Sequence, residues 1–173
     1  MSEFLLLNDI EQIIENISDI SYQFSGKTVL LTGGRGFLGR YFMQIFNSLN
    51  EKVLKEKVKL IVLDNLITSG KEGSEIPSYE NIVFKNHDVI EKFSIEEKID
   101  FIIHAAGIAS PYYYRAYPLE TLEVAINGTK NMLELAEQKS ARLSFFSSSE
   151  IYGDPDPKNI PTKESYKGNV SCI

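Results

Sequence analysis

Apolar residues occur in two different patterns along this chain. Helical spacings of three and four predict helices over residues 37–49 and 118–138, the second beginning at Pro118. Short apolar runs, typical of buried strands, occur at 27–32, 58–63, 82–84, 101–103 and 143–146. Strands that alternate with helices, and that are apolar enough to be buried on both faces, predict a doubly wound α/β fold with a parallel sheet and right-handed crossovers.

An additional amphipathic helix is predicted at residues 9–20, before the first strand. It follows from the spacing of Leu7, Ile10, Ile13, Ile14, Ile17 and Ile20. We expect residues 1–26 to form a helical extension and residues 27–173 to form the α/β domain. The favoured interpretation of the apolar stripe is packing on the domain's own edge, and the alternative is an oligomer contact.

A glycine-rich segment, "TGGRGFLG", joins the first strand to the next helix. Gly33, Gly36 and Gly39 form a G-x-x-G-x-x-G array, which permits a tight turn and lets the backbone approach a diphosphate. The unpaired N–H groups at the helix start, around Phe37 and Leu38, would face the anion. The position of this array between strand and helix predicts a dinucleotide site rather than an ordinary turn.

Acidic residues close the next two strands. Asp64, followed by Asn65, ends the strand in "IVLDNL", where a carboxylate would accept both ribose hydroxyls of an adenosine and repel a 2′-phosphate. This favours NAD over NADP, although Arg35 in the glycine loop would be suited to a 2′-phosphate. Asp88 and Val89 follow the third strand, where we expect an adenine contact.

Small residues follow the fourth strand. Ala105, Ala106 and Gly107 would allow a cofactor to lie against the backbone. We expect the neighbouring His104 to be packed or hydrogen-bonded rather than a proton carrier. We predict no metal site.

The charge and composition of the chain argue against two classes of binding partner, nucleic acid and membrane. The chain has 18 Lys and Arg against 24 Asp and Glu, a net charge of −6, and no basic block, which argues against nucleic acid. No apolar run reaches the length of a membrane span, a secretory signal is lacking at residues 1–26, and Cys172 is the single cysteine. We therefore expect a cytoplasmic protein with no membrane partner.

These motifs together resemble the extended short-chain dehydrogenase/reductase family, whose members have a Rossmann fold and act on nucleotide sugars. The resemblance rests on "TGGRGFLG", "LDNL", "HDV", "HAAG", "NGTKNMLELA" and "SSSEIYGDP", in that order. Two stretches look most like the group that decarboxylates UDP-glucuronate to UDP-xylose. In that group the sugar's 4-hydroxyl is oxidised by NAD, the resulting β-keto acid loses carbon dioxide, and the ketone is reduced again.

The resemblance implies site residues in both stretches. "ASPYYYRAYPLET" is similar to the A-S-P-x-x-Y-x-x-x-P signature, which implies sugar or nicotinamide contacts for Ser110, Pro111 and Tyr114. The three tyrosines at 112–114 would lie on a loop, with filling of the core as the alternative. In "SSSEIYGDP", Ser148 would hold the sugar's 4-oxygen, Glu150 would position the carboxylate or handle the C5 proton, and Ser149 would assist Glu150. Dehydratases of the family carry Asp-Glu where this chain has Ser-Glu.

The family's catalytic base, a Tyr-x-x-x-Lys pair, has no counterpart in these 173 residues. We expect an incomplete Rossmann domain that lacks the sugar subdomain, binds NAD, fails to turn over, and leaves an unpaired sheet edge with exposed apolar surface. The full-length protein would form a homodimer through residues 118–138. A nucleotide-sugar 4-epimerase or 4,6-dehydratase and a non-catalytic NAD-binding module remain the alternatives.

Overall fold

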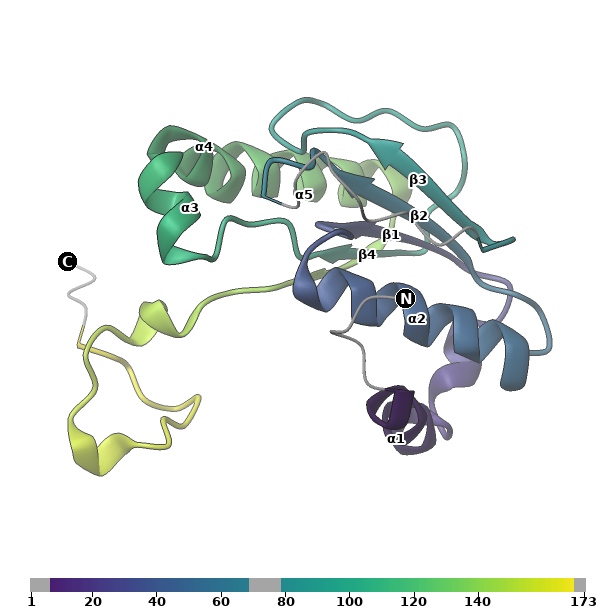
Figure 1. Ribbon diagram of the computed structural model, residues 1–173, viewed down its shortest axis with the longest axis horizontal. Helices are drawn as coiled ribbons and strands as arrows, with labels where there is room; N and C mark the ends of the chain where they lie inside the picture. The colour runs from purple at the N-terminus through teal and green to yellow at the C-terminus, as the bar shows by residue number, and fades with distance from the viewer. Residues whose placement is uncertain (1–6, 69–78, 170–173) are drawn as a thin grey trace.

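The structure is a computed structural model, and it describes residues 7–68 and 79–169. A parallel sheet lies at its centre, with strand order β3-β2-β1-β4-β5 (Figure 1). This order places the first strand in the middle, as a doubly wound fold requires. All predicted strands are present: β1 (Thr28–Thr32), β2 (Lys59–Asp64), β3 (Ile82–Asn86), β4 (Phe101–His104) and β5 (Arg142–Phe145).

Helices cover the middle of the sheet on both faces. On one face, α2 (Phe37–Lys52) packs against Val29 and Leu31 of β1. On the other, α5 (Thr129–Lys139) packs against Leu30 through Met132 and Leu135. Successive residues of β1 thus serve two separate clusters, because side chains of a strand point alternately to opposite faces.

The N-terminal helix α1 (Leu7–Ile17) packs against α2. Ile10 and Ile14 are buried in the same cluster as β1 and α2, and the Tyr41 hydroxyl donates to Asp9 Oδ2 over 3.0 Å. This is the packing favoured from the sequence. The ends of the helix differ from the predicted 9–20: it already includes Leu7 and it ends at Ile17. A 3-10 turn η1 (Ser21–Phe24) follows, and Ile20 is 49% exposed, outside the apolar stripe. Residues 1–6 lie outside the described part.

The segment predicted as one helix at 118–138 is helical but divided. It consists of α4 (Pro118–Glu123), a π-helical turn η2 (Val124–Gly128) and α5. The expectation of a loop at the three tyrosines is wrong, because α3 (Pro111–Ala116) begins with Pro111, whose fixed φ suits a first helical turn. Core filling by all three is also wrong: Tyr112 and Tyr114 are exposed.

The β5 side of the sheet is less covered than its middle. β1 and β2 are buried on both faces as predicted, but the edge strands β3 and β5 are not. Within the described residues β5 pairs only with β4, and Phe145 and Phe146 are 50% and 41% exposed. The expected open edge with apolar surface is therefore present.

The chain after β5 runs away from the sheet (Figure 1). It contains two short 3-10 turns, η3 (Ser149–Tyr152) and η4 (Pro157–Asn159). The Asn169 N–H donates to the Tyr152 carbonyl over 2.9 Å, so this segment returns on itself. Residues 170–173, with Cys172, lie outside the described part. No helix within 7–68 and 79–169 has both the length and the apolar character needed to cross a bilayer.

Candidate cofactor site

The glycine-rich turn between β1 and α2 is tight because side chains would collide there. Gly33 has a left-handed φ of +71°, and a Cβ on it would lie 2.7 Å from the Ala105 carbonyl oxygen. A Cβ on Gly39 would clash with the Gly33 carbonyl oxygen, and one on Gly34 would clash with Val62. Gly34, absent from our sequence prediction, therefore holds the turn close to β2, and the paired glycines of "TGGRG" are its signal.

Helix α2 begins at Phe37 with Gly36 as its N-cap, so no side chain caps its first turn. The first N–H groups of a helix have no helical acceptor and carry partial positive charge. Phe37 and Leu38 are 66% and 45% exposed, so this helix end is open to solvent. The turn and the helix start together can receive an anion on backbone donors.

The Asp64 carboxylate is held in place at the end of β2 by backbone donors on both sides. Its Oδ2 accepts from the Arg35 N–H and its Oδ1 from the Leu66 N–H, each over 2.8 Å. Leu66 has a left-handed φ of 62°, which turns the chain sharply after the strand. A carboxylate oxygen has more than one lone pair, so Asp64 keeps acceptor capacity for a ligand.

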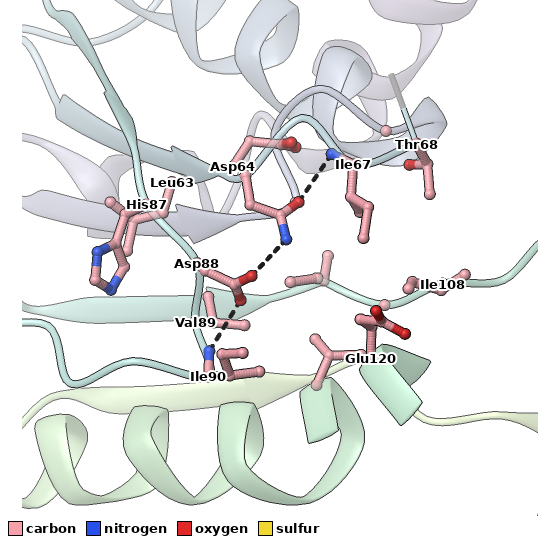
Figure 2. Close-up of a pocket in the computed structure, with 17 residues that line it drawn as sticks. Leu63, Asp64, Ile67, Thr68, His87, Asp88, Val89, Ile90, Ile108 and Glu120 are labelled. Atoms are coloured by element: carbon pink, nitrogen blue, oxygen red, sulfur yellow. Dashed lines mark hydrogen bonds between the residues drawn. The ribbon is translucent and has the colours of Figure 1, made fainter. Parts of the chain in front are cut away.

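A chain of hydrogen bonds connects the ends of β2 and β3 (Figure 2). The Ile67 N–H donates to Asn65 Oδ1 over 3.1 Å, and Asn65 Nδ2 donates to Asp88 Oδ2 over 2.7 Å. Asp88 Oδ1 accepts in turn from the Ile90 N–H over 3.1 Å. Both loops are therefore ordered by their own polar side chains, and the carboxylate of Asp88 is oriented in the pocket.

The residues after β4 are positioned by a buried polar network. Thr32 Oγ1 lies 2.7 Å from His104 Nδ1 and accepts from the Ala106 N–H over 3.1 Å. His104 Nε2 lies 3.3 Å from Thr129 Oγ1 of α5. Burial lowers the pKa of His104 from 6.5 to about 4, which keeps the ring neutral. His104 is thus hydrogen-bonded and buried, as expected from the sequence.

These elements enclose one pocket at the carboxyl ends of β1, β2, β3 and β4, where a doubly wound fold binds its ligands. It gathers nine of the predicted cofactor residues: Gly33, Gly36, Asp64, Asn65, Asp88, Val89, Ala105, Ala106 and Gly107. Phe37, Leu38, Gly39 and Arg35 are not among its lining residues. Eight further residues line the pocket and were not predicted from the sequence: Leu63, Ile67, Thr68, His87, Ile90, Ile108, Glu120 and Val124. Leu63, His87, Ile90 and Ile108 each adjoin a predicted residue, and that adjacency was the available signal. The other four have no predicted neighbour in the sequence.

A family model described as the NAD dependent epimerase/dehydratase family matches residues 29–170. The chain belongs to this family. UDP-glucuronic acid decarboxylase 1 of Danio rerio is 40% identical over 148 residues, which are 85% of this chain and 33% of that protein. UDP-glucuronic acid decarboxylase 1 of Arabidopsis thaliana is 37% identical over 147 residues, 84% of this chain and 31% of that protein. The chain thus spans about a third of the length of these relatives, and the family predicted from the motifs is confirmed.

Solved structures of the same family share the fold. Epimerase Mth375 of Methanothermobacter thermautotrophicus matches with a TM-score of 0.66 and 29% identity, over 81% of this chain and 41% of that one. A UDP-N-acetylglucosamine 4-epimerase of Methanobrevibacter ruminantium, in complex with UDP-N-acetylmuramic acid, matches with a TM-score of 0.64 and 26% identity, over 84% and 44%. The Rossmann fold predicted from the sequence is therefore confirmed.

The residues that the family resemblance implies for the sugar lie outside this pocket. Ser110 is the N-cap of α3, and Pro111 and Tyr114 lie on that short helix after β4. Ser148, Ser149 and Glu150 follow the neighbouring strand β5, and Ser148 Oγ accepts from the Glu150 N–H over 3.3 Å. All six are exposed. Because β4 and β5 are parallel neighbours, both groups leave the same edge of the sheet.

Proposed function

We propose that this chain binds NAD in the pocket at the carboxyl ends of β1–β4, as the cofactor part of a nucleotide-sugar enzyme. The observation that carries the proposal is the convergence of the glycine turn, Asp64 and Asp88 on one pocket. Their order matches the parts of a dinucleotide: donors for the diphosphate, a carboxylate for the ribose and a second carboxylate for the adenine. Bound NAD would supply a reversible hydride acceptor.

The same geometry favours NAD over NADP. Asp64 lines the pocket and would meet a 2′-phosphate with like charge. Arg35 lies in the glycine turn, but its side chain is buried and it is not a lining residue of the pocket. The pocket therefore presents the carboxylate, and not the guanidinium, to the adenosine ribose.

For the reaction we propose decarboxylation of UDP-glucuronate to UDP-xylose through a 4-keto intermediate. Support comes from the similarity to UDP-glucuronic acid decarboxylases and from the Ser-Glu sequence at residues 149 and 150. Ser148 would hold the 4-oxygen, and Glu150, assisted by Ser149, would position the carboxylate or handle the C5 proton. Ser110, Pro111 and Tyr114 would contact the sugar or the nicotinamide.

Calorimetric titration of the 173-residue chain with NAD and NADP tests the cofactor proposal, and NAD should bind the more tightly. Because these residues contain no Tyr-x-x-x-Lys pair, we expect no UDP-xylose when the chain is mixed with UDP-glucuronate and NAD. Appearance of UDP-xylose would refute the inactivity of these residues. Absence of NAD binding would refute the proposed function itself.

A UDP-sugar 4-epimerase is the second candidate, because solved epimerases share the fold at 29% and 26% identity. The two reactions differ in their products. A decarboxylase releases carbon dioxide from UDP-glucuronate, whereas an epimerase retains all carbon atoms. Incubation of the full-length protein with carboxyl-labelled UDP-glucuronate distinguishes them by the label released.

We also propose that the full-length protein pairs through α4 and α5. Four apolar residues along α4, the intervening η2 and α5 are more than half exposed: Leu119, Leu122, Ile126 and Leu133. A row of exposed apolar side chains on paired helices is a surface suited to a second copy. Sedimentation of the full-length protein should show a dimer, and a Leu133→Glu variant should be monomeric.

A further inference from the structure

The beginning of α5 contacts the pocket wall from behind. Asn131, half-buried in the first turns of this helix, is not a lining residue of the pocket. Its Nδ2 donates to the Val89 carbonyl over 2.9 Å and to the Ile90 carbonyl over 2.8 Å. One amide group thus satisfies two consecutive carbonyls of the wall that follows β3.

A close backbone approach accompanies these two hydrogen bonds. Gly128 is buried one turn earlier in the helical run, and a Cβ there would lie 2.9 Å from Val89 Cγ2. The absence of a side chain lets the helix come near enough for the Asn131 amide to reach the wall. The glycine and the second asparagine of "NGTKN" can therefore be explained physically: Gly128 permits the close approach and Asn131 makes the contact.

The segment that Asn131 holds includes the carboxylate proposed to meet the adenine. The Ile90 N–H donates to Asp88 Oδ1, and Val89 and Ile90 both line the pocket. Movement of the Val89 and Ile90 backbone would therefore displace Asp88. Asn131 and Asn65 hold this segment from two different elements, α5 and the end of β2.

We propose that Asn131 is a positioning residue that sets the selectivity for the adenine base. By fixing the Val89 and Ile90 carbonyls, it keeps the Asp88 carboxylate where it accepts from the exocyclic amino group of adenine. This inference rests on the proposed binding of NAD. It goes further by assigning base selectivity to a residue that does not line the pocket.

The test uses an analogue in which hypoxanthine replaces adenine, so that a carbonyl oxygen stands where the amino group was. Wild-type chain should bind NAD about tenfold more tightly than this analogue, the usual effect of one charge-assisted hydrogen bond. In Asn131→Asp at pH 8, a carboxylate would face two carbonyl oxygens and displace the wall. The ratio of the affinities for NAD and for the analogue should fall to about one, mainly because NAD binds more weakly.

Acidification provides a readout that a merely structural role would not move. The two facing carbonyl oxygens disfavour the charged form and raise the pKa of the carboxyl group introduced in the Asn131→Asp variant. Protonation turns this group into a donor, so the variant's preference for NAD, relative to wild type at each pH, should partly return between pH 8 and pH 5. Asn127→Asp places the same charge in the same helical run on an exposed residue, and it should keep the wild-type preference. Asn131→Leu removes the donors without adding charge, and its preference should fall at every pH.

The outcomes separate the two proposals. If the wild-type chain binds neither dinucleotide, the proposed function fails and this inference fails with it. If the wild type prefers NAD and both Asn131 variants keep that preference at all pH values, the proposed function stands and the role of Asn131 is refuted. Should Asn131→Asp not fold, Asn131→Leu alone decides between these results.

Discussion

The residues proposed for the cofactor and those proposed for the sugar differ in how many elements hold them. Asp64 and Asp88 are held by hydrogen bonds that connect three loops, beside the strands β1 and β2, which are buried on both faces. Ser148 and Glu150 follow an edge strand, are exposed, and share one hydrogen bond with each other. Loops from neighbouring strands thus order the residues proposed for the nucleotide, while those proposed for the sugar depend on the end of a single strand.

The largest difference should appear in stability. Leu60 is fully buried at the centre of the sheet, so Leu60→Ala should lower the free energy of unfolding by about 2–5 kcal/mol. Phe145 at the edge is 50% exposed, so Phe145→Ala should cost about 1 kcal/mol or less. Urea denaturation of the two variants measures both values. Equal costs would contradict the contrast between the covered middle and the open edge.

The pH dependence of stability should reveal the buried network behind the cofactor pocket. Burial lowers the pKa of His104 from 6.5 to about 4, so between these values the unfolded chain binds a proton that the folded chain does not. The free energy of unfolding therefore falls with acidification, by about 2 kcal/mol from pH 7 to pH 5. In His104→Gln this part of the slope should vanish. An unchanged slope in that variant would assign the effect to other groups.

Substitutions near the pocket and beyond β5 should differ in their effect on the affinity for NAD. Asp64→Ala removes the acceptor proposed for the ribose hydroxyls, so the affinity for NAD should fall at least about tenfold and the preference over NADP should shrink. Tyr166→Ala alters the segment beyond β5, where Tyr166 packs near Tyr152, and should leave NAD affinity unchanged. Titration calorimetry measures both variants. An equal loss in Tyr166→Ala would show that the two sides are coupled.

The smallest expected change in stability concerns the packing of α1 against α2. Tyr41→Phe deletes the hydroxyl that donates to Asp9, and it should lower the free energy of unfolding by about 1 kcal/mol. Tyr22→Phe makes the same change on a residue that is 69% exposed, and it should be neutral. Thermal denaturation compares the two. A neutral Tyr41→Phe would mean that this hydrogen bond does not help to hold α1.

The sequence predicted best where local pattern and tertiary packing agree. β1, α2 and the glycine turn follow from apolar runs, helical spacing and glycines whose side-chain space is occupied by Ala105 and Val62. The end of α1 and the extent of the tyrosine segment were predicted wrongly. Ile20 continues the apolar spacing but is 49% exposed, and Pro111 starts a helix that three adjacent aromatics did not indicate.

Tertiary contacts between distant residues could not be predicted from spacing. Nothing in the sequence near Asn131 indicates that its amide reaches Val89, because the two residues meet only when α5 packs across the sheet. The same holds for Glu120 and Val124, which line the pocket from the helical run of α4 and η2. Such contacts depend on the crossing of elements, which residue patterns do not specify.

Because the Asn169 N–H donates to the Tyr152 carbonyl, the residues between them form a loop whose two ends lie together. The entropy of closing such a loop grows only slowly with its length, so a longer or shorter loop could be closed at a similar cost. A protein with a different loop at this place would therefore keep the sheet and the pocket that precede it. The pocket proposed for the nucleotide could in this way stay the same while the surface next to the residues proposed for the sugar changes.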